Sequence, residues 1–215
     1  LGVPAVYTIV PGAHFLDRTR DTDFAQHAAR TMLRSLPIDQ LPPHMERLLD
    51  LFGPRYDLTF FLAHSLELEE RPDAALPLFL RALEQNPHPR EVASIHVHIA
   101  SCHKDLGNYH EALDALAQAE QSNNELKEIY NLRGYCYYQL KRHQESIDAF
   151  ERAIELDPGS GIDYANIGSN LRELGFKQEA IRLYRMALEL DPDIDFARDN
   201  IEKLEAAIRK ESTAG

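Results

Sequence analysis

The sequence predicts an all-α fold, an α-solenoid of antiparallel helix pairs, from three observations. A 34-residue period runs from Tyr56 to Ile194. Apolar residues inside each period follow helical spacing, as Tyr164, Ile167 and Leu171 do. Small residues recur at three positions of the period: Ala63, Ala100, Gly134 and Gly168 at the eighth; Ala75, Ala112, Ser146 and Ala180 at the twentieth; Ala82, Ala119, Ala153 and Ala187 at the twenty-seventh. Periods of this length belong to stacked helix pairs that share one core and offer a binding surface in place of a catalytic pocket.

Each period divides into two helices joined by a short turn. Gly107-Asn108, Lys141-Arg142 and Gly175 mark the turn in the second, third and fourth repeats. A proline then ends the second helix, because proline cannot continue a helix and restrains the residue before it. These prolines are Pro87, Pro158 and Pro192.

The third and fourth repeats carry the motifs of a known family. The runs GYCYY…SIDAFERAIELDP and YANIG…EAIRLYRMALELDP resemble the tetratricopeptide repeat over residues 127–160 and 161–194, and residues 56–89 and 93–126 match it more loosely. The resemblance implies a right-handed superhelix in which the first helix of each repeat faces a concave groove. Members of the family use this groove to bind other proteins or peptides.

Two departures from the period predict local irregularities. Residues 90–92 are an insertion, which we expect to add a turn to the start of the following helix, over Ser94 to Lys104. Pro77 lies inside the second helix of the first repeat. Because proline removes a backbone donor, we expect that helix to be short or bent.

The flanks of the array are expected to cap it. Residues 195–211 form an amphipathic pattern, with Phe196, Ala197 and Leu204 on one face, which predicts a C-terminal capping helix. Residues 22–55 predict a helical N-terminal cap or degenerate repeat, with helices at 22–36 and 43–52. Residues 1–21 are expected to be extended, either packed along the first helices or the remnant of a preceding domain.

The family's groove positions can be read from the repeats, and they define the candidate binding residues. Tyrosines beside small polar groups suit an extended peptide or a helix, because they offer a large contact area at a low entropy cost. The candidates are Phe60, His64, Val97, Ser101, Lys104, Asn131, Tyr135, Tyr138, Ser169 and Arg172, with Glu67, Asp105, Glu128, Gln139, Ile162, Ala165 and Glu173 beside them. Alternatively, Tyr135 and Tyr138 only fill the interior of the superhelix.

Two specialised grooves of the family are not supported by the sequence. A clamp for a C-terminal carboxylate needs paired cations, but its positions hold Val97, Ser101, Leu132, Ile162 and Asn166. A ladder of asparagines for peptide backbone would need Asn in every repeat. Those positions hold Phe61, His98, Leu132 and Asn166.

Composition narrows the function class further. Residues 1–55 balance six Arg against six acids, so the net charge of -12 falls on residues 56–215. Such an acidic array argues against nucleic-acid binding, which needs clustered Lys and Arg. No run of about 18 apolar residues suggests a membrane span. Cys102 and Cys136 lie one period apart, too far for a disulfide between neighbouring helices, so we expect free thiols and a cytoplasmic protein.

No catalytic motif, cofactor motif or metal site is predicted. His96 and His103 occupy positions that pack between helices, so we interpret them as core residues. His98 and Cys102 are four residues apart and could form a surface pair that binds adventitious zinc.

The sequence therefore predicts a non-enzymatic protein-interaction scaffold that binds a peptide or helix. The alternative is a regulatory or substrate-docking domain of a larger enzyme whose catalytic part precedes residue 1. The partner and the oligomeric state are not indicated by the sequence.

Overall fold

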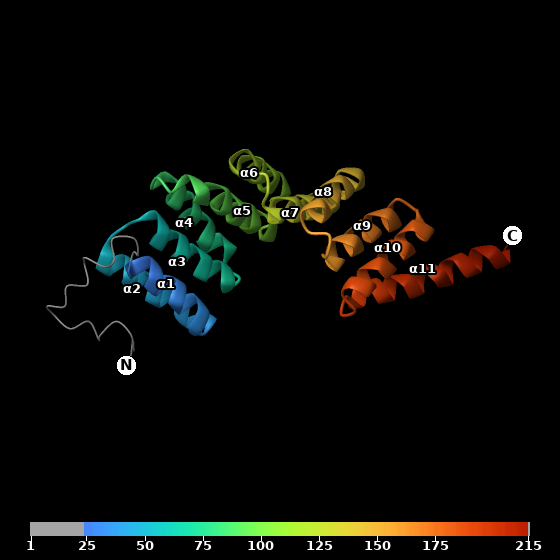
Figure 1. Ribbon diagram of the computed structural model, residues 1–215, viewed down its shortest axis with the longest axis horizontal. Helices are drawn as coiled ribbons and strands as arrows, with labels where there is room; N and C mark the ends of the chain where they lie inside the picture. Colours follow the sequence, from blue (N-terminus) through green and yellow to red (C-terminus); the bar gives the residue numbers. More distant parts are fainter. Residues whose placement is uncertain (1–23, 215) are drawn as a thin grey trace.

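The computed structural model describes residues 24–214, and all their regular structure is helical. The helices follow one another along an arch from α1 to α11 (Figure 1). The segment 1–21, expected to be extended, lies outside the described residues.

Four helix pairs form the body of the arch and confirm the predicted solenoid. Each helix packs most extensively against the other helix of its own pair. The pairs are α3 (Tyr56–Leu68) with α4 (Pro72–Glu84), α5 (Pro89–Asp105) with α6 (Tyr109–Ser122), α7 (Lys127–Gln139) with α8 (His143–Leu156), and α9 (Gly161–Glu173) with α10 (Lys177–Leu190). Successive pairs contact each other through α4 and α5, α6 and α7, and α8 and α9.

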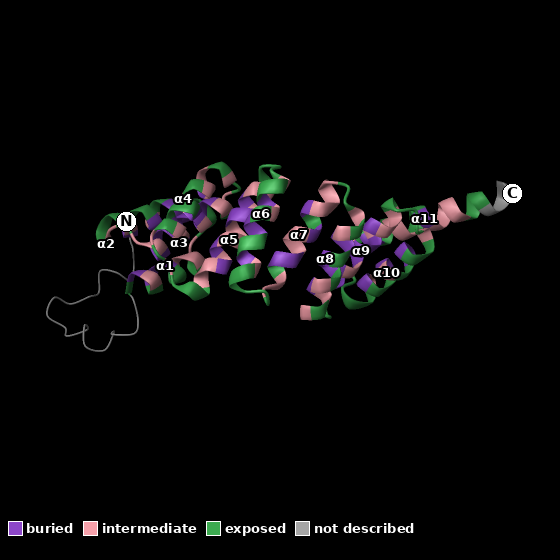
Figure 2. Ribbon diagram, turned by 90° about the horizontal axis from the view of Figure 1, so that it is seen from above, coloured by how far each residue is buried: buried purple, intermediate pink, exposed green. Residues whose placement is uncertain are grey.

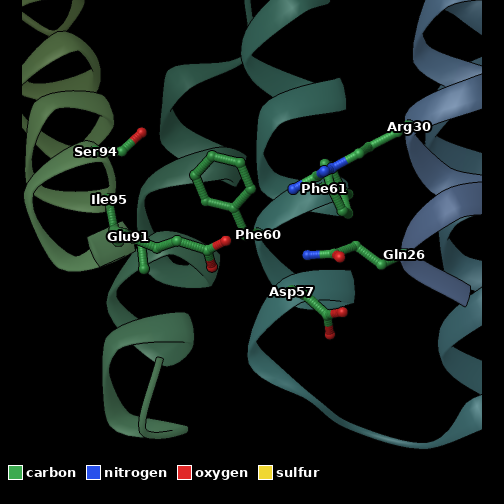
Figure 3. Close-up of a pocket in the computed structure, with 8 residues that line it drawn as sticks. All are labelled: Gln26, Arg30, Asp57, Phe60, Phe61, Glu91, Ser94 and Ile95. Carbon is green, nitrogen blue, oxygen red and sulfur yellow. The ribbon is translucent and has the colours of Figure 1, made fainter. Parts of the chain in front are cut away.

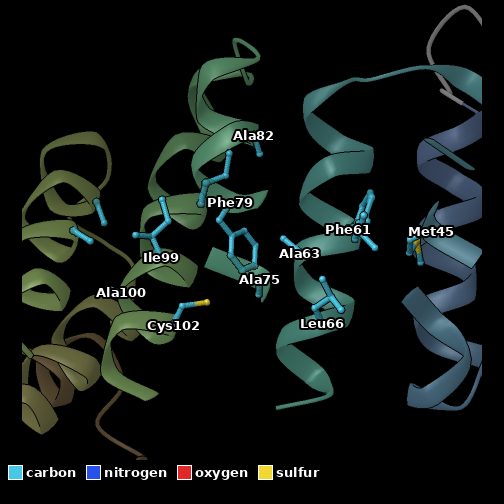
Figure 4. Close-up of a cluster of buried hydrophobic side chains, with 14 of the residues drawn as sticks. Met45, Phe61, Ala63, Leu66, Ala75, Phe79, Ala82, Ile99, Ala100 and Cys102 are labelled. Carbon is cyan, nitrogen blue, oxygen red and sulfur yellow. The ribbon is translucent and has the colours of Figure 1, made fainter. Parts of the chain in front are cut away.

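The repeated small residues bring the helices together. All twelve are buried, as the sequence predicted. A bulky residue lies beside them in each repeat, and Phe79, Leu116, Phe150 and Tyr184 are all buried. Figure 4 shows this packing in the first half of the arch, where Phe79 of α4 lies between α3 and α5. Figure 2 shows buried positions along the whole array.

The turn inside each repeat uses a left-handed residue at one fixed position. Glu70, Gly107, Lys141 and Gly175 have φ of 58°, 78°, 61° and 88°. Glycine adopts this conformation without the steric cost that a side chain brings. The two glycines predicted to mark turns are therefore where the backbone requires them, whereas Glu70 and Lys141 take the same conformation with a side chain.

The two predicted irregularities turn out differently. The insertion is absorbed as expected, because α5 has 17 residues and α3, α7 and α9 have 13 each. Pro77 was expected to leave a short or bent helix, and α4 has 13 residues, one fewer than α6, α8 and α10 with 14 each. The helix begins at Pro72, where a missing N–H costs nothing, and Pro77 then removes a single donor from the helix.

Further helices lie at both ends. At the N-terminal end, α1 (Phe24–Ser35), a 3₁₀ turn (Ile38–Gln40) and α2 (Leu41–Phe52) place Ala29, Leu41 and Met45 in the core. At the other end, α11 (Asp195–Ala214) packs on α10 and buries Ala197 and Leu204. Phe196, expected to face inward, is 39% exposed and only touches the edge of the Tyr184 ring, at 6.5 Å between centroids.

Candidate functional site

The first helices α1, α3, α5 and α7 lie side by side and form an inner surface. Within the first half of the array, α1 contacts α3, α3 contacts α5, and α5 contacts α7. The second helices α4, α6 and α8 lie along the outer edge of the arch (Figure 1). The ten principal candidate residues all lie on α3, α5, α7 and α9, and none of them is fully buried. Ala165, expected beside them in the groove, is fully buried against the core, so that prediction was wrong.

Two adjoining cavities lie between α7 and α9, and we call them together the tyrosine groove. One has a volume of about 140 Å³ and the other about 280 Å³. Both are lined by Tyr135, Phe150 and Asn166. The smaller is completed by Tyr138, Gln139, Ser169 and Asn170, and the larger by Lys104, Lys127, Asn131, Leu132, Ile162 and Asp163.

The two tyrosines are held by their neighbours in different ways. Tyr135 is 43% exposed, with the Lys104 ammonium 5.7 Å from its ring centroid and Tyr109 edge-on at 6.4 Å. Tyr138 is half-buried, and its hydroxyl accepts a hydrogen bond of 3.4 Å from Arg172 of the next repeat. Tyr135 therefore offers an open ring face, and Tyr138 has its polar tip already engaged.

A buried acid lies at the wall of the larger cavity. Asp163 is fully buried, and its Oδ1 accepts a hydrogen bond from the Asn131 amide. Its Oδ2 has no hydrogen-bond partner among the described residues and lies 3.5 Å from Lys127 Nζ. Burial lowers the pKa of Lys127, but the adjacent Asp157 and Asp163 outweigh it and raise that pKa. The buried carboxylate is thus held within the wall by Asn131 and Lys127.

A hydrogen-bond network connects the third and fourth repeats behind the smaller cavity. The Asn170 amide donates 2.9 Å to Ser146 Oγ, which donates 2.7 Å to the Gly134 carbonyl. The Asn170 Oδ1 lies 3.0 Å from His143 Nδ1. Neither Asp163 nor Asn170 was among the sequence candidates. An Asn or Asp in the first helix of a repeat is common on exposed faces, so no signal in a single sequence distinguishes these two buried ones.

A separate cluster occupies the N-terminal half of the inner surface. A cavity of about 190 Å³ lies between α1, α3 and α5, and Phe60 forms part of its wall (Figure 3). Phe60 also contacts two histidines, with ring centroids 6.2 Å from His64 and 5.1 Å from His98. Both imidazoles have Nδ1 at hydrogen-bond distance from Glu67 Oε2, 3.2 Å for His64 and 2.7 Å for His98.

The electrostatics of this cluster centre on the carboxylate. Burial raises the pKa of Glu67, but the hydrogen bonds with His64 and His98 outweigh burial and hold that pKa at about 2. Ser101, a sequence candidate, also hydrogen-bonds to Glu67 and lowers its pKa. The remaining candidate on α5, Val97, is partly buried and packs against the core.

The histidine and cysteine predictions need one correction. Cys102 is fully buried and does not form a surface pair with His98, which pairs instead with Glu67. Burial raises the pKa of the Cys102 thiol to about 12, which disfavours the thiolate form in the folded chain. Both cysteines are free, as predicted. His96 and His103 are half-buried between helices, and burial lowers the pKa of His96.

Comparison with known families finds a match to three of the four repeats. Family profiles of the tetratricopeptide repeat match residues 93–125, 128–160 and 164–194. Among curated proteins, no sequence match was found.

Solved structures share the architecture at low sequence identity. MamA is 20% identical over 76% of this chain and 94% of its own, with a TM-score of 0.67. YrrB, described as a TPR protein with an unusual peptide-binding site, is 17% identical over 81% and 89%, with a TM-score of 0.66. A chain of the APC/C hetero-tetramer Cut9-Hcn1 is 17% identical over 86% and 36%, with a TM-score of 0.72. At these identities the likeness concerns the fold.

None of the helices between residues 24 and 214 combines the length and the apolar composition that crossing a membrane requires.

Proposed function

This chain is a tetratricopeptide repeat protein over residues 93–194, and from that premise we propose that it binds an extended peptide segment of a partner protein in the tyrosine groove. The observation that carries the proposal is the place of Tyr135, which lines both cavities and keeps much of its ring exposed. A flat aromatic side chain that is already ordered binds a partner without losing much side-chain entropy.

The walls of the groove favour an extended peptide over an apolar helix. An apolar helix would need a continuous apolar surface to bind. The lining of the larger cavity is mixed: Leu132 and Phe150 are apolar, and Asn131, Asn166 and Asp163 are polar. The Asn131 and Asn166 amides suit backbone N–H and C=O groups, which an extended segment presents and a helix does not.

The cations along the groove are balanced by acids of the chain itself. Lys104 and Lys127 lie at the larger cavity, and Arg172 reaches the hydroxyl of Tyr138 beside the smaller one. Each of them is already paired with an acid of the chain: Lys104 with Asp105, Lys127 with Asp157, and Arg172 with Glu173. We therefore expect the preferred peptide to supply apolar residues for the tyrosines, and an acidic residue in it would have to compete with these ion pairs.

The fold of YrrB, a TPR protein with a peptide-binding site, supports a peptide ligand by analogy of architecture. The experiment is selection of peptides from a displayed library on the immobilised protein, followed by photo-cross-linking. A benzophenone amino acid in place of exposed Ile162, which lines the larger cavity, should capture the selected peptide. The same group in place of exposed Phe176, in the turn before α10, should not. Equal capture at both positions would argue against the groove.

A further inference from the structure

Three side chains of different helices converge on one point at the inner surface of the first two repeats. His64 and Glu67 lie one turn apart on α3, and His98 lies on α5. One potential ligand atom from each residue falls in a group whose members all lie within 4.8 Å of one another. We propose that His64, Glu67 and His98 bind a divalent transition-metal ion, with Zn²⁺ as the best fit.

The donor set matches the chemistry of zinc. Two imidazole nitrogens and one carboxylate oxygen are ligands that Zn²⁺ accepts in proteins, with bonds of about 2.0–2.2 Å. Donors arranged tetrahedrally at that range lie roughly 3.4 Å from one another. Here the His98 and His64 Nδ1 atoms already lie 2.7 and 3.2 Å from Glu67 Oε2. Small side-chain rotations therefore suffice to open room for an ion between them.

The rings that would hold the ion are oriented by aromatic packing. His98 is stacked on Phe79, with ring centroids 5.1 Å apart and an interplanar angle of 12°. Phe60 meets His98 edge-on at 5.1 Å and lies nearly parallel to His64, at 20°. Buried Phe79 belongs to the core, so the rings are held by packing that does not depend on a metal.

The carboxylate is oriented as well. Glu67 also hydrogen-bonds to Ser101, one turn beyond His98 on α5. Outer partners of this kind fix the direction of a ligand and are a regular part of metal sites. The side chains of His64, Glu67 and His98 are 28%, 14% and 24% exposed, so an ion can reach them from the inner surface.

Three protein ligands leave a fourth position open. Structural zinc sites are usually closed by four protein ligands, whereas an open site keeps water or an incoming ligand in the fourth place. No fourth His, Cys, Asp or Glu joins the group among the described residues. The open position therefore faces the inner surface, where a side chain of a bound protein can complete the coordination.

The test uses the whole chain, freed of metal by a chelator and titrated with Co²⁺ and then Zn²⁺. We expect one equivalent of Co²⁺ to give the visible spectrum of four-coordinate cobalt, and Zn²⁺ to displace it with a Kd below about 10 μM. Since loss of outer partners alone costs 10–100-fold in affinity, His98→Gln and Glu67→Gln should each weaken binding by about 100-fold or more.

The matched control is His96→Gln, which removes a half-buried histidine of the same helix outside the cluster and should leave affinity unchanged. Binding that survives in both cluster variants would show an adventitious ion on other histidines and overturn the proposal. Binding weaker than about 1 mM in the unaltered chain would do the same. If the variants fail to fold, X-ray absorption of the zinc-loaded unaltered chain still tests the site. We expect two imidazoles and no sulfur among the zinc ligands. A zinc ion without imidazole ligands would contradict the site.

Discussion

Gly134 in α7 lies directly against the ring of Phe150 in α8, so that a Cβ atom at residue 134 would be 2.7 Å from Cε2 and Cζ of that ring. Gly168 has the equivalent place in the next repeat, where the distance to the Tyr184 ring would be 3.2 Å. The same structural position therefore has less room for a methyl group at Gly134 than at Gly168.

Substitution of Gly134 by Ala should consequently destabilise the array. Real Cβ atoms do not approach a ring to 2.7 Å, and Phe150 is buried and cannot move away freely. We expect Gly134→Ala to lower the free energy of unfolding in urea by about 1–3 kcal/mol, despite the helix propensity of Ala. Gly168→Ala is the matched control and should cost less. An equal effect at both positions would contradict the packing described.

The left-handed turn position predicts a stabilising substitution. Glu70 adopts φ of 58°, where Gly107 and Gly175 stand in other repeats. Glu70→Gly should raise the free energy of unfolding by roughly 0.5–1 kcal/mol, because relief of strain exceeds the added entropy of the unfolded chain. Gly175→Ala should lower it by about 1 kcal/mol. If Glu70→Gly is destabilising, the conformation at this turn is not the strained one described.

The buried amide between repeats predicts a stability loss of a different origin. Asn170→Ala removes the partner of Ser146 Oγ and of His143 Nδ1. We expect a loss of about 1–3 kcal/mol in the free energy of unfolding, since buried polar groups lose their hydrogen bonds. Asn166→Ala, one helical turn earlier on the half-buried side, should bring no loss. Similar losses in both variants would indicate that the network contributes nothing specific.

The two buried thiols should react slowly with thiol reagents, and they should make the stability of the fold depend on pH in the alkaline range. Burial raises the pKa of Cys102 to about 12 and that of Cys136 to about 11. At pH 8 a thiol-specific reagent should label neither residue until urea unfolds the chain. Rapid labelling of the folded chain would contradict the burial of both.

The sign of the pH effect follows from the direction of these shifts. The folded thiols hold their protons more tightly than unfolded thiols, whose pKa is about 9. The stability they contribute is fully present below pH about 9 and is lost as pH rises toward 11–12. In a chain carrying Cys102→Ala and Cys136→Ala, the free energy of unfolding should fall less steeply over that range. Identical slopes would show that the thiols do not titrate as described.

The fold could be predicted from the sequence because its main determinant is local and repeated. A small residue such as Ala153 is needed wherever two helices approach closely, so the spacing of small residues reports the spacing of helices directly. The effect of Pro77 does not follow from the sequence alone, because it depends on where α4 begins, and that helix begins at Pro72.

The candidate site could be predicted only in part. The first-helix positions of Tyr135 and Tyr138 follow from the register of the family, which places residues on a face. Contacts between repeats cannot be predicted from this register, because they depend on how side chains of different helices meet. For example, His98 lies on the same helix as Cys102 but pairs with Glu67 of the preceding repeat. Asp163 was missed for the same reason, since its burial comes from a neighbouring repeat.

Peptide binding in the tyrosine groove is best tested by the dissociation constant of a selected peptide for the chain carrying Tyr135→Ala and Tyr138→Ala. Both tyrosines line the smaller cavity, and paired aromatic anchors of this kind are worth about 2 kcal/mol or more. The control is Phe176→Ala, which removes an exposed ring outside the groove. We expect the double variant to keep its helical content and melting temperature and to bind at least about 30-fold more weakly, with the control unchanged. A dissociation constant that stays the same in the double variant would contradict a peptide site in the tyrosine groove.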